Sequence, residues 1–268
     1  MISTFALHPS ASKYLIAQAV ASMPEVQTVF QNGKIFIGHG TTNAFIVEAL
    51  FKKPVEDIEC YVSGVIAQKS ACATEPENRQ EPWCIEKGQI IQTDWLEFIN
   101  TFQKGDIFIK GANALDSQGR VGILIGDPQG GTIGKSLGIL KARGITIINP
   151  VGLEKMIPSC EEAEKHMGIN KIGPHLGLKL GYICLSNTTV ITETDSIKIL
   201  FDLPAFQVAA GGVNGMEGSV VLAVESNDEK KLKEVINYVK HANQQKPLKI
   251  KKKSCADCPA PCDIIKAE

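Results

Sequence analysis

DIFIKGANALDSQGRVGILIGDPQGGTIGKSLGILKARGITIINP, residues 106–150, is the stretch that decides the fold. Three apolar runs in it, at 106–110, 121–125 and 145–148, have the length and composition of buried strands. Between the last two, residues 132–143 show the apolar spacing of a helix. Strands that alternate with helices in this way are typical of an α/β domain with a mainly parallel sheet.

The same alternation extends toward the N-terminus. We expect helices at 11–22, 42–53 and 94–102 and strands at 34–37 and 61–67, with the polar stretch 70–87 as a long loop. Toward the C-terminus we expect strands at 189–191, 197–201 and 219–225 and an amphipathic helix at 228–242. The prediction is a Rossmann-like α/β core with flanking helices at 1–172, a small α+β extension at 173–243, and a basic, cysteine-bearing tail at 244–268.

Composition narrows the classes of function. The chain has 268 residues, 44% of them hydrophobic, which is enough for a full globular core. A net charge of -1 and 6% aromatic residues argue against nucleic acid or an anionic membrane as a partner. No apolar run is long enough to span a bilayer, and no signal peptide is recognisable. We therefore expect a cytoplasmic protein that acts on a small molecule, and we leave a homo-oligomer open.

The first glycine-rich connection joins the strand at 34–37 to the following helix. It contains Gly38, His39, Gly40, Thr41, Thr42 and Asn43. Glycine lets a ligand approach the backbone, and the start of a helix attracts an anion. A tight turn with a threonine cap is the plain alternative. His39 is the best acid–base candidate because its charge can change near neutral pH.

Two similar connections follow the strands at 106–110 and 121–125. The residues predicted to bind substrate there are Lys110, Gly111, Asn113, Gly130, Gly131 and Thr132, and the carboxylates predicted to be catalytic are Asp116 and Asp127. Ligands of α/β sheets bind at the carboxyl ends of the strands. Each connection can equally be a turn held by Asn or Asp side chains. Three of them at successive strand ends favour one shared site.

Two later connections are less informative. Glu154 and Lys155 follow the strand at 145–148 and fit either a solvated helix start or the edge of the same site. Glu217 lies among glycines before the strand at 219–225. A carboxylate on such a turn is a candidate nucleophile or general base, and an exposed turn acid is the alternative.

These motifs resemble those of the superfamily of ribose-5-phosphate isomerase, glucosamine-6-phosphate deaminase and CoA transferases. The resemblance rests on the Gly-His-Gly-Thr-Thr segment at 38–42 and on Lys-Gly-Ala-Asn-Ala-Leu-Asp at 110–116. Within it the chain is most similar to lactate-utilisation-type domains, through 111–114, 145–155 and the cysteines near its end. The resemblance implies a Rossmann-like sheet whose strand-end loops bind a phosphosugar, an acyl-CoA or a related anion. It does not transfer a reaction, since Asn113 and Ala114 stand where the isomerases carry acidic residues, and Glu217 matches the transferase glutamate poorly.

The tail contains three closely spaced cysteines, Cys255, Cys258 and Cys262. This spacing recurs in sites for zinc and iron–sulfur clusters, although a fourth ligand is needed. A redox-labile tail without metal is the alternative.

Two hypotheses follow. In the first, an enzyme of isomerase or transferase type binds a small anionic metabolite. Gly40, Thr41 and Thr42 hold the anion, Lys110 neutralises it, and Asp116 or Asp127 transfers a proton. In the second, a non-catalytic accessory or redox protein carries zinc or an iron–sulfur cluster on its tail.

Overall fold

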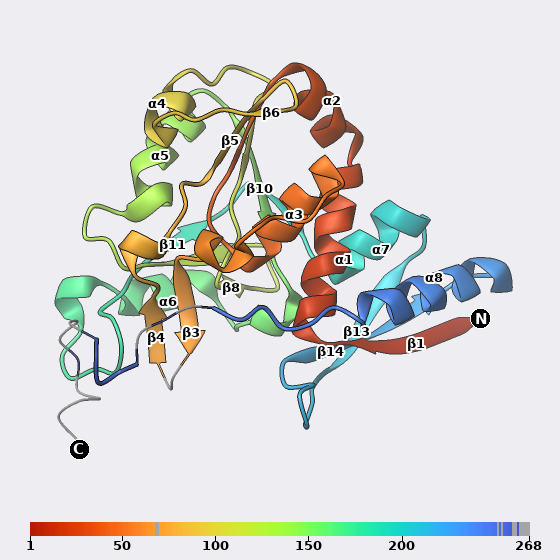
Figure 1. Cartoon of the computed structure of the whole chain (residues 1–268). Helices are drawn as coiled ribbons and strands as arrows, with labels where there is room; N and C mark the ends of the chain where they lie inside the picture. The colour runs from red at the N-terminus through yellow and green to blue at the C-terminus, as the bar shows by residue number, and fades with distance from the viewer. Residues whose placement is uncertain (68–69, 251, 253, 259–261, 263–268) are drawn as a thin grey trace.

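A six-stranded sheet with helices on both faces forms the centre of the computed structural model (Figure 1). The structure describes residues 1–67, 70–250, 252, 254–258 and 262. The strand order is β12-β10-β7-β2-β5-β6. The first four strands are mutually parallel, and β5 and β6 are antiparallel to their neighbours. The strands are β2 (Lys34–Ile37), β5 (Trp83–Glu86), β6 (Gln89–Ile90), β7 (Ile107–Ile109), β10 (Thr146–Pro150) and β12 (Thr189–Ile191). The α/β, Rossmann-like fold class predicted from residues 106–150 is therefore confirmed.

Strand β2 shows why both faces of this sheet are covered. Ile35 and Ile37 belong to the apolar cluster beneath α1, α2 and α3, whereas Phe36 belongs to the cluster beneath α4 and α5. Successive side chains of a strand point to opposite faces, so an unbroken apolar run requires cover on both sides. Phe36 stacks on Phe108 of β7, with ring centroids 4.9 Å apart. The helices are α1 (Pro9–Ser22), α2 (Pro24–Asn32), α3 (Thr41–Phe51), α4 (Trp95–Asn100), α5 (Gly131–Ala142), α6 (Cys160–His166), α7 (Glu193–Phe201) and α8 (Glu229–Ala242).

Two antiparallel sheets flank the centre. One has the order β11-β9-β8 and contains β8 (Ala114–Leu115), β9 (Val121–Ile125) and β11 (Gly181–Leu185). The run at 121–125 is thus a strand, as predicted, but it lies outside the parallel sheet. Tyr182 lies over Gly122, where a Cβ atom would stand 1.7 Å from its hydroxyl. Glycine is therefore required on β9 at this point.

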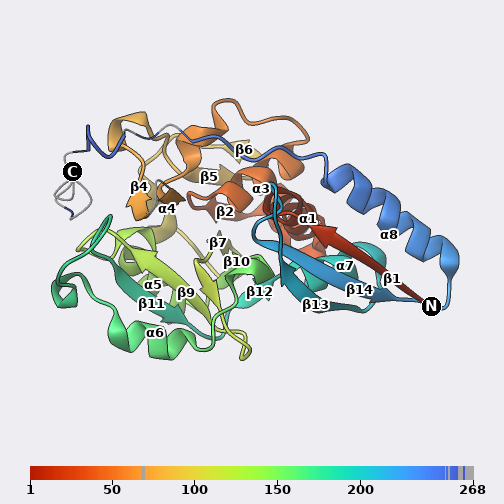
Figure 2. The ribbon, with the colours of Figure 1, turned by 90° about the horizontal axis from the view of Figure 1, so that it is seen from below.

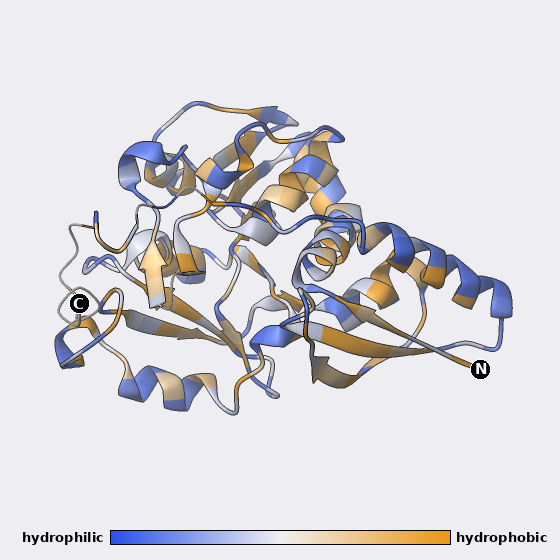
Figure 3. Ribbon diagram, turned by 60° about the horizontal axis from the view of Figure 1, so that its bottom comes forward, coloured by the Kyte–Doolittle hydropathy of each residue, from blue (hydrophilic) through white to orange (hydrophobic). Residues whose placement is uncertain are grey.

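The other flanking sheet has the order β1-β14-β13 and contains β1 (Ile2–Leu7), β13 (Ala205–Gly211) and β14 (Ser219–Glu225). Its first strand comes from the N-terminus, with Ile2 opposite Glu225. Conversely, β12 of the predicted extension joins the central sheet. The halves predicted at 1–172 and 173–243 therefore exchange strands (Figure 2). Helix α8 covers this sheet, and hydrophilic and hydrophobic positions alternate along it (Figure 3).

The prediction of one long loop at 70–87 is wrong at two segments, which form strands. Residues Ser70–Ala73 form β4, which pairs with β3 (Gly64–Ala67) in a hairpin. The apolar residues at 83–85 are buried in β5 of the central sheet. The hairpin rests on Gly177, whose neighbour Leu178 donates its N–H to the carbonyl of Ala71 at 2.9 Å. A long-range backbone contact of this kind leaves no periodic signal in a polar stretch.

The strand predicted at 197–201 is also wrong, because these residues lie in α7. Thr192 and Asp195 form a capping box at the start of this helix. Ile197, Leu200 and Phe201 then follow at helical spacing and pack against the apolar core. Among the described residues, no helix is long and apolar enough to cross a membrane.

Candidate functional site

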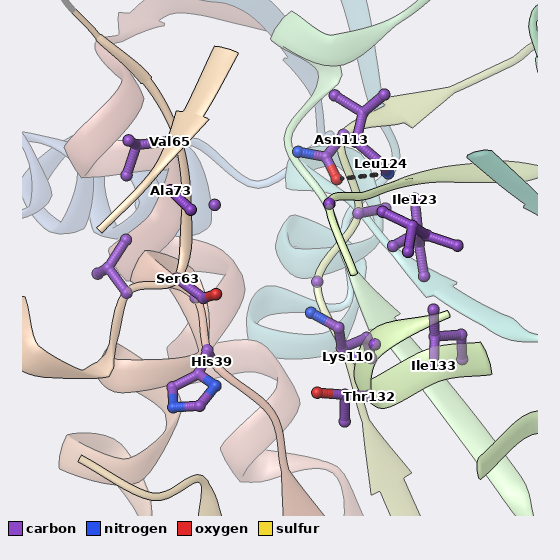
Figure 4. A pocket seen from close by; sticks show the side chains of 18 of the residues that line it. His39, Ser63, Val65, Ala73, Lys110, Asn113, Ile123, Leu124, Thr132 and Ile133 are labelled. Carbon is purple, nitrogen blue, oxygen red and sulfur yellow. Dashed lines mark hydrogen bonds between the residues drawn. The ribbon is translucent and has the colours of Figure 1, made fainter. Parts of the chain in front are cut away.

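A cavity of about 600 Å³ lies where the strand-end loops meet the β3–β4 hairpin (Figure 4). The loops that follow β2, β7 and β9 all line it, and the hairpin supplies the facing wall. The volume is in the range typical of small-molecule sites, roughly 300–1,000 Å³. The three glycine-rich connections singled out in the sequence therefore meet at one place.

The loop after β2 is held in shape by its own hydrogen bonds. The N–H of Gly38 donates to the carbonyl of Ile109, and that of Gly40 to the carbonyl of Tyr61, both at 3.0 Å. The buried Asn43 side chain donates to the carbonyl of Gly38 at 2.7 Å. Its other side-chain atom, Oδ1, has no hydrogen-bond partner in the described part of the chain. Asn43 thus fixes the loop, while the first residues of α3 line the cavity without a side-chain cap.

The loop after β9 brings a second helix start to the cavity. Gly130 and Gly131 have φ values of +93° and +57°, in the left-handed region. A Cβ atom on Gly130 would lie 2.9 Å from the Cα atom of Gly134, so only glycine fits there. Helix α5 begins at Gly131 after Gly130, which has no side chain to cap it, and Thr132 also lines the cavity. The carboxylate of Asp127 interacts with the N–H of Gly131, so this helix start is satisfied in part. Uncapped N–H groups at a helix start favour a bound anion.

The carboxylate of Asp127, in the same loop, is held by a hydrogen bond and an ion pair. It accepts a hydrogen bond from the N–H of Gln129 at 2.9 Å and pairs with Lys135 at 3.2 Å. The Gln129 bond and the Lys135 contact lower the pKa of the carboxyl against a smaller opposing effect of burial. Asp127 is therefore ionised at neutral pH and is a weak base.

The loop after β7 places Lys110 between the two walls (Figure 4). Its backbone N–H donates to the carbonyl of Ile148 at 3.0 Å, and its carbonyl accepts from Asn149 at 2.6 Å. Asn113, three residues on, accepts from the N–H of Leu124 at 3.0 Å. This oxygen of Asn113 therefore ties the loop to β9.

Positive charge dominates the lining. Apart from Cys72, the titratable residues of the lining are His39, Arg79, Lys110, Asp127, Lys135 and Lys155. Four of these six have basic side chains, one is a histidine and one is a carboxylate. Unlike charges attract most strongly where water is scarce, so such a cavity favours an anion.

Lys110 and His39 have shifted pKa values. Burial, together with the positive charge of Lys155, lowers the pKa of Lys110 to about 8. Burial is also the main cause that lowers the pKa of His39, and the charge of Lys110 acts in the same direction. The Nε2 atom of His39 donates to the carbonyl of Gln80 at 2.7 Å. The ring is therefore neutral at pH 7, with Nδ1 as its free acceptor.

Asp116, predicted to be catalytic, lies outside the cavity lining. Its carboxylate is buried and accepts from the N–H groups of Gln118, Arg120 and Cys160 and from the Arg120 guanidinium at 3.0 Å. Burial opposes ionisation, but the bonds from Cys160 and Arg120 outweigh it and hold the pKa of Asp116 below its usual value. These contacts assign Asp116 to the structure of the β8–β9 turn.

Glu217 also lies away from the cavity. It sits in the β13–β14 connection, where it accepts from the N–H of Gly215 at 2.8 Å. The predicted metal ligands Cys255, Cys258 and Cys262 are half-buried in the tail. Among the described residues, no group of three or more His, Cys, Asp or Glu side chains is placed to hold a metal. Metal binding by the tail stays a prediction.

Sequence reasoning missed the hairpin wall and Arg79. Arg79 follows β4 and donates to the hydroxyl of Thr74 at 2.8 Å. No motif marks it, and only a prediction of the hairpin would have placed it. Lys155, left open above, does line the cavity and donates to the carbonyl of Ala112 at 3.0 Å.

Two acids, the fully buried Glu193 and the half-buried Glu154, lie in the region of Lys155. Glu193 is fully buried and accepts from the N–H of Leu153 at 2.9 Å, while its Oε1 atom has no partner among the described residues. Burial first, and then the charge of Glu154, raise the pKa of Glu193 to about 7. The pair therefore brings titratable acid close to a cavity lysine.

Comparisons of the chain with protein-family models, curated proteins and solved structures found no match.

Proposed function

We propose that this protein binds a small anionic metabolite in the cavity and carries out an isomerisation or group transfer on it. The ligand classes are those expected from the sequence, namely a phosphosugar, an organic acid or an acyl-CoA. One observation carries the proposal. Two helix starts preceded by glycine and four basic side chains surround a single cavity that holds one carboxylate.

The helix starts and the cations act on the same part of a ligand. The first turns of α3 and α5 offer N–H groups, and Thr41, Thr42 and Thr132 add hydroxyls. A phosphate or carboxylate accepts several such bonds at once. The apolar remainder of the lining, including Val65, Ile123 and Leu180, suits the uncharged part of the metabolite.

The resemblance to the isomerase, deaminase and CoA-transferase superfamily stays a prediction, and it agrees with this choice of ligand. A reducing compartment such as the cytoplasm suits the free thiols at Cys60, Cys72, Cys84, Cys160 and Cys184.

The test is a binding panel on the full chain. Inorganic phosphate, ribose 5-phosphate and acetyl-CoA are titrated by calorimetry, with ribose as the uncharged control. We expect at least one anion to bind and ribose not to bind. Lys110→Met removes one cation and should weaken the binding of that anion about tenfold, as expected for one charge-assisted contact worth about 1.4 kcal/mol.

Lys104→Met is the matched control. It removes an exposed lysine that does not line the cavity, and we expect it to bind like the wild type. If no anion binds, or if both variants weaken binding equally, the cavity is not an anion site.

A further inference from the structure

Lys110 differs from the other cations of the cavity because its amine is uncommitted. Lys135 pairs with Asp127 at 3.2 Å, and Lys155 donates to the carbonyl of Ala112 at 3.0 Å. The Nζ atom of Lys110 makes no hydrogen bond or ion pair with any described residue, and the figure shows it directed into the gap between the walls (Figure 4). The partnered lysines already place positive charge beside a bound anion. The unpaired amine of Lys110 is therefore available for a reaction in addition to its contact with the anion.

The stem of Lys110 is held in place. A Cβ atom on Gly38 would lie 3.0 Å from Cδ of Lys110, so the glycine gives the stem room against the first loop. The backbone of Lys110 is fixed on both sides, by Ile148 and Asn149. The amine is thus presented from a rigid strand end, as a reacting group must be.

A titratable partner stands nearby. His39 lies on the wall opposite Lys110 (Figure 4), and the charge of Lys110 contributes to the lowered pKa of its ring. Because Nε2 of His39 donates to the carbonyl of Gln80, its Nδ1 atom is the nitrogen left to accept a proton. Apolar side chains such as Ile133 and Leu178 complete the lining.

We propose that Lys110 is a nucleophile that forms an imine with a carbonyl group of the bound anion. The ligand class is then an anionic aldehyde or ketone, such as a sugar phosphate in its open-chain form or a 2-oxo acid. This inference rests on the proposed function, because the anion-binding groups hold the ligand while Lys110 reacts with it.

The step balances without a further reactant. The neutral amine of Lys110 attacks the carbonyl carbon, the C=O electron pair moves to oxygen, and one proton passes from nitrogen to that oxygen. The hydroxyl then takes up a second proton and leaves as water, while the nitrogen lone pair forms C=N. The iminium nitrogen finally loses its remaining transferable proton, which replaces the one taken up by the hydroxyl. We assign the acceptance and return of these protons to His39 on the facing wall. Because burial and Lys155 lower the pKa of Lys110 to about 8, its neutral fraction at pH 7 exceeds that of an ordinary lysine on the order of a hundredfold.

The experiment compares two probes of nearly identical shape on the full chain. Pyridoxal 5′-phosphate carries an aldehyde and a phosphate, whereas pyridoxine 5′-phosphate carries an alcohol in place of the aldehyde. Borohydride reduction after incubation with the aldehyde fixes any imine as a secondary amine, and peptide mapping locates it. We expect the adduct at Lys110 well above that at Lys104, and we expect inorganic phosphate to suppress it.

Lys110→Arg separates charge from nucleophilicity. It keeps the positive charge but cannot form an imine, so we expect the mapped adduct to be lost while binding of pyridoxine 5′-phosphate stays measurable. If pyridoxine 5′-phosphate binds but the adduct is distributed evenly over exposed lysines, the imine proposal is wrong while the anion-binding proposal stands. Both proposals fail if pyridoxine 5′-phosphate does not bind and phosphate gives no protection.

Discussion

The cavity and the polar cluster around Asp116 lie at the two ends of one short segment, residues 110–116, yet their charged groups are placed in opposite ways. At one end the amine of Lys110 has no partner among the described residues. At the other, the carboxylate of Asp116 accepts four hydrogen bonds, from Gln118, Arg120 and Cys160. Removing one member of a fully partnered buried cluster destabilises a fold, whereas a buried charge without partners already costs stability in the folded state. The difference separates a group that holds the structure from one that is available to a ligand.

Asp116→Ala should have the largest effect. It removes every acceptor of the cluster and leaves Arg120 with only its exposed partner Glu161. We expect a loss of about 3–5 kcal/mol in the free energy of unfolding, as for a broken buried pair. Because the folded pKa of Asp116 is lowered, its contribution is present above the unfolded value near 3.9 and is lost as pH falls through the folded value. Urea unfolding at pH 7 and at a series of pH values below 3.9 measures both.

Asp127→Ala is the matched control, because it removes the same charge from an ion pair that is 39% exposed on the carboxylate side. We expect less than about 1 kcal/mol for such a pair. Equal losses in the two variants would contradict the distinction between the cluster and the cavity.

Glu193→Gln should have the second largest effect, and here we expect a gain in the free energy of unfolding. The folded pKa of Glu193 is raised to about 7, so its stabilising contribution is full below the unfolded value near 4.3 and is lost as pH rises through 7. At pH 8 the buried ionised group costs stability, and glutamine keeps an acceptor for the N–H of Leu153 without the charge. We expect a gain of about 2 kcal/mol at pH 8 that disappears near pH 4.

Thermal unfolding across this range checks the prediction, with exposed Glu234→Gln as the control. A gain of the same size at pH 4 would show that packing, and not the charge of Glu193, is responsible.

The cavity could be predicted from the sequence in large part, whereas the structural role of Asp116 could not. The loops at 38–43, 110–116 and 127–132 were expected to share a site, because the carboxyl ends of neighbouring strands meet at one edge of a sheet. That rule accounts for the loops after β2 and β7, which are neighbours in the central sheet, but not for the loop after β9, which belongs to another sheet. It fails for Asp116, since the chain turns into β8 after residue 113 and carries the carboxylate away from the edge.

The hairpin wall and Glu193 were missed for a different reason. Residues 70–73 are half-buried small residues without alternation, and their pairing depends on Gly177, a hundred residues away. Glu193 begins a helix whose apolar residues at 197–201 were predicted as a strand. Contacts between distant segments decide both positions, and local periodicity does not contain them.

Lys110→Met should give a smaller gain in stability. The folded pKa of Lys110 is about 8, below the unfolded value near 10.4, so its charge is a cost below pH 8 that disappears above about 10.5. Because Lys110 is only partly buried, we expect the variant to be more stable by about 1–2 kcal/mol at pH 7 in buffer without phosphate or sulfate.

Lys104→Met should change little in the same urea titration, since Lys104 is exposed. A bound anion should reverse the order, because it stabilises the wild type and not the variant. A Lys110→Met protein that is less stable than the wild type without any anion would mean that the amine has a structural partner after all.

Glu217→Gln should have the smallest effect, and it tests whether glycine-rich turns are sites in general. The connection at 211–218 is as rich in glycine as the loops of the cavity, but it joins two antiparallel strands and leads into no helix. Its carboxylate accepts only the N–H of Gly215, a bond that a glutamine oxygen can also accept. We expect a change below about 0.5 kcal/mol in unfolding free energy, as for an ordinary surface substitution, and unchanged anion binding. A loss of binding would place a second functional region at this turn, and it would show that glycine content identifies a site without a helix start. Unchanged binding would leave the helix start and the uncommitted amine as the features that distinguish the cavity.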